Sequence, residues 1–106
     1  MYEEEYSRCR EEVTKSDEEY IQKTRKLEKA IEDINFLRNR ARVEMETIIY
    51  EAKYSARKLC SNYHSQRLEN KMMDIYEDFN YNAIREINKI EGQLEELIRQ
   101  RRQEIF

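Results

Sequence analysis

The sequence contains no proline, no tryptophan and a single glycine among its 106 residues. An average chain carries roughly 7% glycine and 5% proline, and these residues form the tight turns that hairpins, sandwiches and barrels require. A nucleotide-binding α/β domain needs a glycine-rich phosphate loop, whereas Gly92 lies alone inside a helical pattern. We therefore predict an all-α protein that forms one domain over residues 1–106.

The chain also lacks a charge excess and long apolar runs. Its 20 basic residues stand against 23 acidic ones, a net charge of −3, so no overall basic excess draws it to nucleic acid or to anionic lipid. Its apolar runs fall far short of the roughly 20 residues of a membrane span and of the about 7–15 of a signal peptide. We expect a cytoplasmic protein without a membrane span or a nucleic-acid partner, and export together with a protein partner stays open.

Residues for catalysis or metal binding are scarce. Cys9 and Cys60 fit no metal or redox spacing, and reduced thiols are the expected state, with an inter-helix disulfide as the alternative. His64 is the only histidine, which excludes the di-iron bundle motif because that motif needs two. We expect no enzymatic activity, no catalytic residue, no metal, no cofactor and no small-molecule substrate.

Apolar residues recur every seven positions through the first half of the chain. The first line is Tyr6, Val13, Tyr20, Leu27, Ile34, Ala41 and Ile48. A second line completes the alternation of three and four with Tyr2, Cys9, Ser16, Thr24, Ile31, Arg38, Met45, Ala52 and Leu59. Such a seam is typical of a coiled-coil or long-bundle helix. Its polar members Ser16, Thr24 and Arg38 are candidates for fixing the register.

A second seam occupies the other half of the chain. Its members are Leu68, Met72, Ile75, Phe79, Ala83, Ile87, Ile90, Leu94, Leu97, Arg101 and Ile105. Gly92 lies within this helix and is either tolerated there or permits a close helix contact. The most turn-like residues, Ser61–Ser65, separate the seams, and Ser65 could cap the second helix, with Asn62 as a substitute for glycine at the end of the first.

We therefore predict a long antiparallel two-helix hairpin, coiled-coil-like, with helices at about 3–60 and 66–104. A turn near Tyr54-Ser55-Ala56 and a single unbroken helix are the alternatives. The arms are unequal, so residues before about Glu19 should have nothing opposite them within the chain. Further apolar residues lie beside the seams: Phe36, Leu37, Val43, Ile49, Tyr54, Met73, Tyr76, Tyr81, Ile84 and Ile98.

This apolar surface exceeds what one hairpin can bury, which indicates a helical partner, either another protein or a second copy. The residues expected to bind it are Tyr2, Tyr6, Val13, Tyr20, Leu27, Ile31, Ile34, Met45, Ile48, Met72, Ile75, Phe79, Ile87 and Leu94.

In size, helical pattern and polar composition, the whole chain resembles the small helical-hairpin proteins of bacterial type VII secretion, the WXG-like superfamily. More narrowly, it resembles the accessory proteins encoded beside LXG-domain toxins. The resemblance implies a targeting factor or chaperone that packs beside the helical LXG domain of a toxin. The chain lacks a Trp-x-Gly turn and a Tyr-x-x-x-Asp/Glu signal, which implies that it depends on the signal of its partner.

Two functions follow from these observations. The first is a helical adaptor that packs against a helical partner, most concretely an LXG domain. The second is a structural coiled-coil protein that associates with itself into a homodimer or tetramer. A nucleic-acid-binding regulator is a third reading, which the acidic net charge disfavours.

Overall fold

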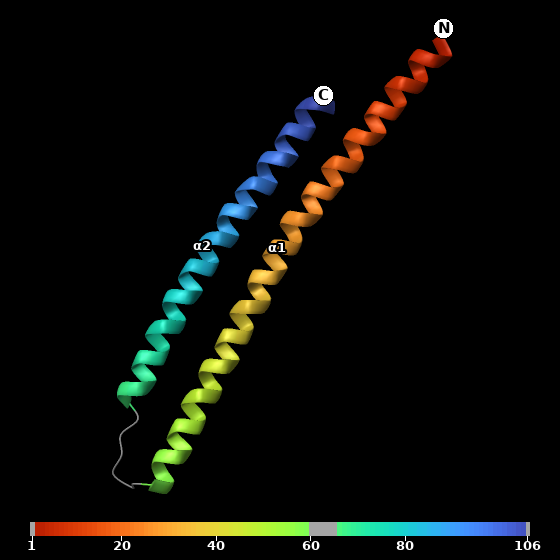
Figure 1. The fold of residues 1–106 in the computed structure, drawn as a ribbon. Coiled ribbons are helices and arrows are strands. Elements are labelled where there is room, and N and C mark those ends of the chain that lie inside the picture. The colour runs from red at the N-terminus through yellow and green to blue at the C-terminus, as the bar shows by residue number, and fades with distance from the viewer. Residues whose placement is uncertain (1, 60–65, 106) are drawn as a thin grey trace. The chain divides into compact units, whose positions relative to one another are not determined.

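The computed structural model describes residues 2–59 and 66–105, and Figure 1 shows the fold. Two long helices make up the described chain, α1 (Tyr2–Leu59) and α2 (Gln66–Ile105), without any strand. The predicted helical hairpin is confirmed, and its bounds agree with 3–60 and 66–104. The alternative turn at Tyr54-Ser55-Ala56 is wrong, because these residues lie inside α1.

The ends of the helices carry charges that suit the helix dipole. The first turn of α1 contains Glu3, Glu4 and Glu5, and its last turn contains Arg57 and Lys58. In α2, the acidic and basic ends are marked by Glu69 and Arg102. The predicted turn Ser61–Ser65, with its cap candidates and His64, lies outside the described residues, as does Cys60.

The helices divide between two compact units. Unit 1 comprises residues 1–31 and 89–106, and unit 2 comprises residues 32–88. Each unit holds one stretch of α1 and one of α2, and the two stretches run in opposite directions (Figure 1). In unit 2, for example, Lys53 near the end of α1 pairs with Glu69 near the start of α2.

Few of the described side chains are buried, and those that are buried belong to α2. Ala83 and Ile87 in unit 2 and Ile90 in unit 1 are each 8% exposed. None of the described residues of α1 is buried, because a single neighbouring helix covers only one side of it. Within the described ranges, neither helix is long and apolar enough to cross a membrane.

The inward residues of unit 2 depart from the predicted heptads. On α1, Ile49 is half-buried whereas Ile48 is 45% exposed. On α2, Leu68, Met72, Tyr76 and Asn80 are half-buried, whereas Ile75 and Phe79 are 63% and 41% exposed. Four residues turn an α-helix by about 400°, so this row moves around α2 by about 40° at each step, whereas a seven-residue repeat drifts by only about 20° in the opposite sense. Ile48, Ile75 and Phe79, which the heptads place in the seams, are therefore exposed beside the contact between the helices.

The prediction that nothing covers α1 before Glu19 is also wrong. Arg101 of α2 pairs with Asp17 in unit 1, and Glu104 lines a shallow hollow together with Cys9 and Val13. The prediction assumed that the last residues of α1 lie directly opposite the first residues of α2. In unit 2, the first turn of α2 instead lies beside Lys53, short of the end of α1. In unit 1, the residues of α1 ahead of Cys9 extend past these contacts.

Candidate partner-binding surfaces

The inner seam of unit 1 consists of half-buried apolar side chains from both helices, next to the buried Ile90. Those of α1 are Tyr20, Leu27, Ala30 and Ile31, and those of α2 are Leu94 and Leu97. These residues bury apolar area between the helices, which is the dominant favourable term in folding. The seam therefore holds unit 1 together and is not free for a partner.

Arg101 closes this seam with polar contacts. Its side chain is only 17% exposed and forms an ion pair with Asp17. One guanidinium nitrogen donates hydrogen bonds to Ser16 Oγ at 3.0 Å and to Glu104 Oε2 at 3.3 Å. The guanidinium also lies 5.6 Å from the centre of the Tyr20 ring, within reach of a cation–π interaction.

Two polar contacts cross the seam of unit 2. Arg38 Nε donates a hydrogen bond of 2.7 Å to Asn80 Oδ1, and Arg38 Nη1 donates one of 3.1 Å to Asn35. Lys53 Nζ lies 3.2 Å from a carboxylate oxygen of Glu69. A polar contact at a seam position favours one register over its neighbours, because any shift would leave the groups unpaired.

The three polar seam residues of the sequence therefore behave differently. Ser16 and Arg38 bond across to α2. The hydroxyl of Thr24 instead donates to the Tyr20 carbonyl of its own helix at 2.7 Å, so it does not link the helices.

The residues predicted to bind a partner fall into two groups. Eight lie in the intrachain seams, half-buried or buried: Tyr20, Leu27, Ile31, Ile34, Met45, Met72, Ile87 and Leu94. The other six are exposed: Tyr2, Tyr6, Val13, Ile48, Ile75 and Phe79. Partner binding remains a prediction for all of them, and only the second group is accessible without opening the hairpin.

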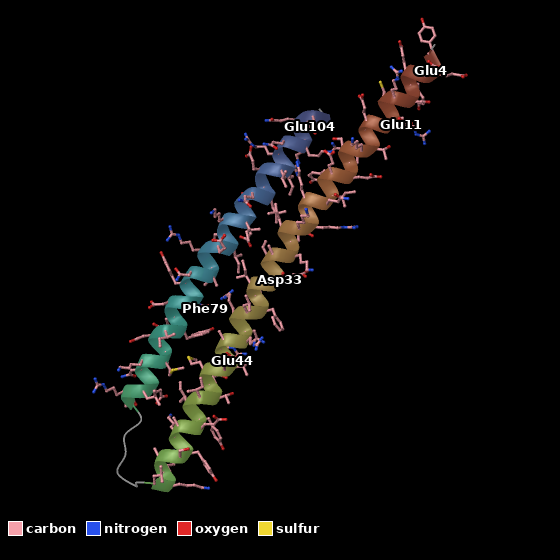
Figure 2. All side chains as sticks on the ribbon, in the orientation of Figure 1. Glu4, Glu11, Asp33, Glu44, Phe79 and Glu104 are labelled. Atoms are coloured by element: carbon pink, nitrogen blue, oxygen red, sulfur yellow. The ribbon has the colours of Figure 1, made fainter. Side chains whose placement is uncertain are left out.

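An apolar flank surface, defined by Leu37, Ile48, Ile75 and Phe79, lies along unit 2. Leu37 is 50% exposed, and Figure 2 labels Phe79 on α2. At about 100° per residue, Leu37 and Ile48 occupy one flank of α1 and Lys53 occupies the other. Ile75 and Phe79 likewise lie across α2 from Glu69, which pairs with Lys53. The four side chains therefore share one face of unit 2.

A second apolar line, the back stripe, follows the side of α1 that faces away from α2 in unit 2. Phe36, Val43 and Tyr50 recur every seven residues and are 65%, 46% and 71% exposed. Tyr54 continues the line at 53% exposure, and the Lys58 ammonium lies 4.5 Å from the centre of its ring. Sequence reasoning placed Phe36, Val43 and Tyr54 beside the seam but missed Tyr50 and the regular spacing.

The start of α1 carries a third exposed group in unit 1. Tyr2 and Tyr6 are 88% and 70% exposed, and they lie in the part of α1 that extends past the contacts made by Glu104. We call this part the overhang.

Sites for other chemistry do not stand out among the described residues. Residues 2–59 and 66–105 contain no group of three or more histidine, cysteine, aspartate or glutamate side chains that could hold a metal ion. Cys9 is a free, exposed thiol. The shifted titrations belong to a surface pair on α2, where hydrogen bonds from Arg99 lower the pKa of Glu96 and the same bonds raise the pKa of Arg99.

Comparison of the chain with protein-family models, curated proteins and solved structures finds no match.

Proposed function

We propose that this protein is a non-enzymatic adaptor, a targeting factor or chaperone that binds a helical partner. The partner is most concretely the LXG domain of a type VII secretion toxin, bound in the cytoplasm before export. The observation that carries the proposal is the exposure of large apolar side chains on the flank surface and the overhang of a chain with 41% charged residues. Contiguous exposed apolar surface is typical of protein–protein interaction sites.

The mechanism is burial of the flank surface under a helix of the partner. Ile75 and Phe79 lie one turn apart on α2, and Leu37 and Ile48 border them on α1, so together they line a shallow apolar strip along unit 2. An amphipathic helix lays its apolar residues into such a strip at spacings of three and four. The exposed carboxylate of Glu51 borders the strip on α1, which favours a partner helix with a basic flank.

The test is co-purification with an LXG-domain protein encoded beside this gene. Changing Ile75→Asp together with Phe79→Asp should abolish capture of that domain, because two charges would be buried without partners. Substitutions at Leu27 or Ile34 are less informative, since both are half-buried in the intrachain seams and their loss would also open the hairpin.

Tyr81→Asp is the matched control. Tyr81 is 67% exposed and lies on the side of α2 away from the flank surface, so this variant should capture the partner as the unmodified chain does. Undiminished capture by the Ile75→Asp/Phe79→Asp variant, with its helicity intact, would refute the assignment of the surface.

A further inference from the structure

The back stripe of α1 is part of a longer line of exposed residues that alternates by three and four. The line runs Asp33, Phe36, Arg40, Val43, Thr47, Tyr50, Tyr54 and Arg57, and every member is exposed. It spans about 36 Å at 1.5 Å per residue and lies entirely within unit 2. Alternation by three and four is the pattern by which one helix packs along another, yet α2 occupies the opposite side of α1.

We infer that this line of α1 packs against the same line of a second copy of the chain. The two α1 helices run antiparallel and are related by a two-fold axis. When the line is placed antiparallel to its own copy, each side chain faces one of complementary charge or shape. With Val43 opposite Thr47 of the second copy, the facing pairs are Asp33 with Arg57, Phe36 with Tyr54, Arg40 with Tyr50, and Val43 with Thr47. The first pair matches opposite charges, the second stacks two aromatic rings, and the third places a guanidinium on a ring. Two-fold symmetry makes each pair twice.

Other registers lose this complementarity. A shift by one heptad in one direction sets Arg40 against Arg57 of the second copy, two like charges. A shift in the other direction sets Asp33 against Tyr50 and leaves Arg57 without an acidic partner. Parallel packing in register also fails. The residues on either side of the line would then place Glu46 of one copy beside Glu51 of the other, and these two carboxylates repel.

The side chains of unit 2 are already arranged for this interface. The Lys58 ammonium holds the ring of Tyr54 at 4.5 Å, and Arg40 is held by Glu44 at 3.0 Å. Glu44 and Glu46 approach their own copies near the two-fold axis. Each is neutralised within its own chain, Glu44 by Arg40 and Glu46 by Arg42 at 3.1 Å, which limits their mutual repulsion.

The size of the interface indicates a weak dimer. Each copy contributes three aromatic side chains, and a fully buried aromatic covers about 150–250 Å². With Val43 and the polar members, the total comes to about 1,000 Å², which is near the lower limit of a specific interface. The fraction of dimer therefore rises with the protein concentration, and the dimer dissociates on dilution. The dimer does not depend on the proposed adaptor function.

A charge swap tests the pairing. The molar mass of the purified full-length chain is measured by light scattering and sedimentation over a wide range of concentrations. Asp33→Arg alone and Arg57→Asp alone should each weaken the dimer by about tenfold, since each places like charges opposite one another. An equimolar mixture of the two variants should restore it, because every facing pair then matches an acid with a base. The double variant Asp33→Arg/Arg57→Asp should restore it for the same reason.

Phe36→Glu should give a monomer that remains helical by circular dichroism, and Tyr81→Glu, which alters an exposed tyrosine on α2, should leave the dimer unchanged. A chain that is monomeric at every concentration would overturn the inference. So would a dimer that neither the charge reversals nor Phe36→Glu weakens. Capture of an LXG domain by the monomeric Phe36→Glu variant separates the two proposals, because the adaptor proposal predicts that this capture is retained.

Discussion

The guanidinium of Arg101 in α2 forms an ion pair with the carboxylate of Asp17 in α1, and this pair is the last contact between charged groups of the two helices in unit 1. It joins residues far apart in the sequence and fixes which turn of α2 lies beside which turn of α1. Arg101 is 17% exposed and Asp17 is 48% exposed, so water screens the pair only in part.

Asp17→Ala should loosen the end of α2. Because the pair is partly exposed, we expect a loss of at most about 1 kcal/mol in the free energy of unfolding. The local effect should be clearer, since exchange of amide hydrogens in the last turns of α2 should accelerate. Glu18→Ala, at an exposed neighbouring position, is the control. Equal exchange rates in the two variants would show that the pair does not hold the helix end.

Ile87→Ala should destabilise the hairpin far more than Ile75→Ala does. Ile87 is 8% exposed, whereas Ile75 is 63% exposed. Truncation of a buried isoleucine costs about 2 kcal/mol or more, and truncation at an exposed position usually changes stability by less than about 0.5 kcal/mol. Urea unfolding at low protein concentration measures both. A larger loss of unfolding free energy for Ile75→Ala than for Ile87→Ala would show that Ile75 packs between the helices, as the heptad register of the sequence predicts.

Gly92→Ala should stabilise the protein. A Cβ atom added at this position meets nothing within 4 Å, so the glycine does not permit a close helix contact. Alanine in a helix interior is favoured over glycine by about 1 kcal/mol, and the free energy of unfolding in urea should rise by about that amount. A fall in stability would indicate that α1 or a second chain approaches the backbone at this point.

The Glu96–Arg99 pair should respond to acid. Two hydrogen bonds from Arg99, of 3.0 and 2.6 Å, lower the pKa of Glu96 below its ordinary value of 4.5. A lowered carboxyl pKa means that the pair stabilises the helix at neutral pH and that this contribution is lost as the pH falls through the lowered pKa. An NMR titration of the Glu96 carboxyl should show its pKa rising in Arg99→Gln and unchanged in Arg102→Gln.

The two helices could be predicted from the sequence because almost every residue that breaks helices is missing. Extrapolation of the seven-residue repeat failed at Ile48, Ile75 and Phe79, and between Leu68 and Asn80 the half-buried row on α2 advances by fours. Tyr76 and Asn80 occupy those positions, and the amide of Asn80 accepts a hydrogen bond from Arg38. A polar residue with a partner 42 positions away carries no local signal.

The back stripe was missed for a related reason. Four of the eight members of the line that contains it are charged or polar, namely Asp33, Arg40, Thr47 and Arg57. In the sequence they are indistinguishable from a solvated surface, and their regular spacing becomes meaningful only once the direction of α2 is known.

In the described parts of the chain, only Ala83, Ile87 and Ile90 are buried, and this bears on the lifetime of the protein in a cell. So small a core provides little free energy against opening, and a protease cleaves the opened form. A bound helix that covers the flank surface stabilises the closed form by mass action. Under the proposed adaptor function, protein made in excess of its partner would therefore be degraded, and turnover would keep the two proteins in proportion.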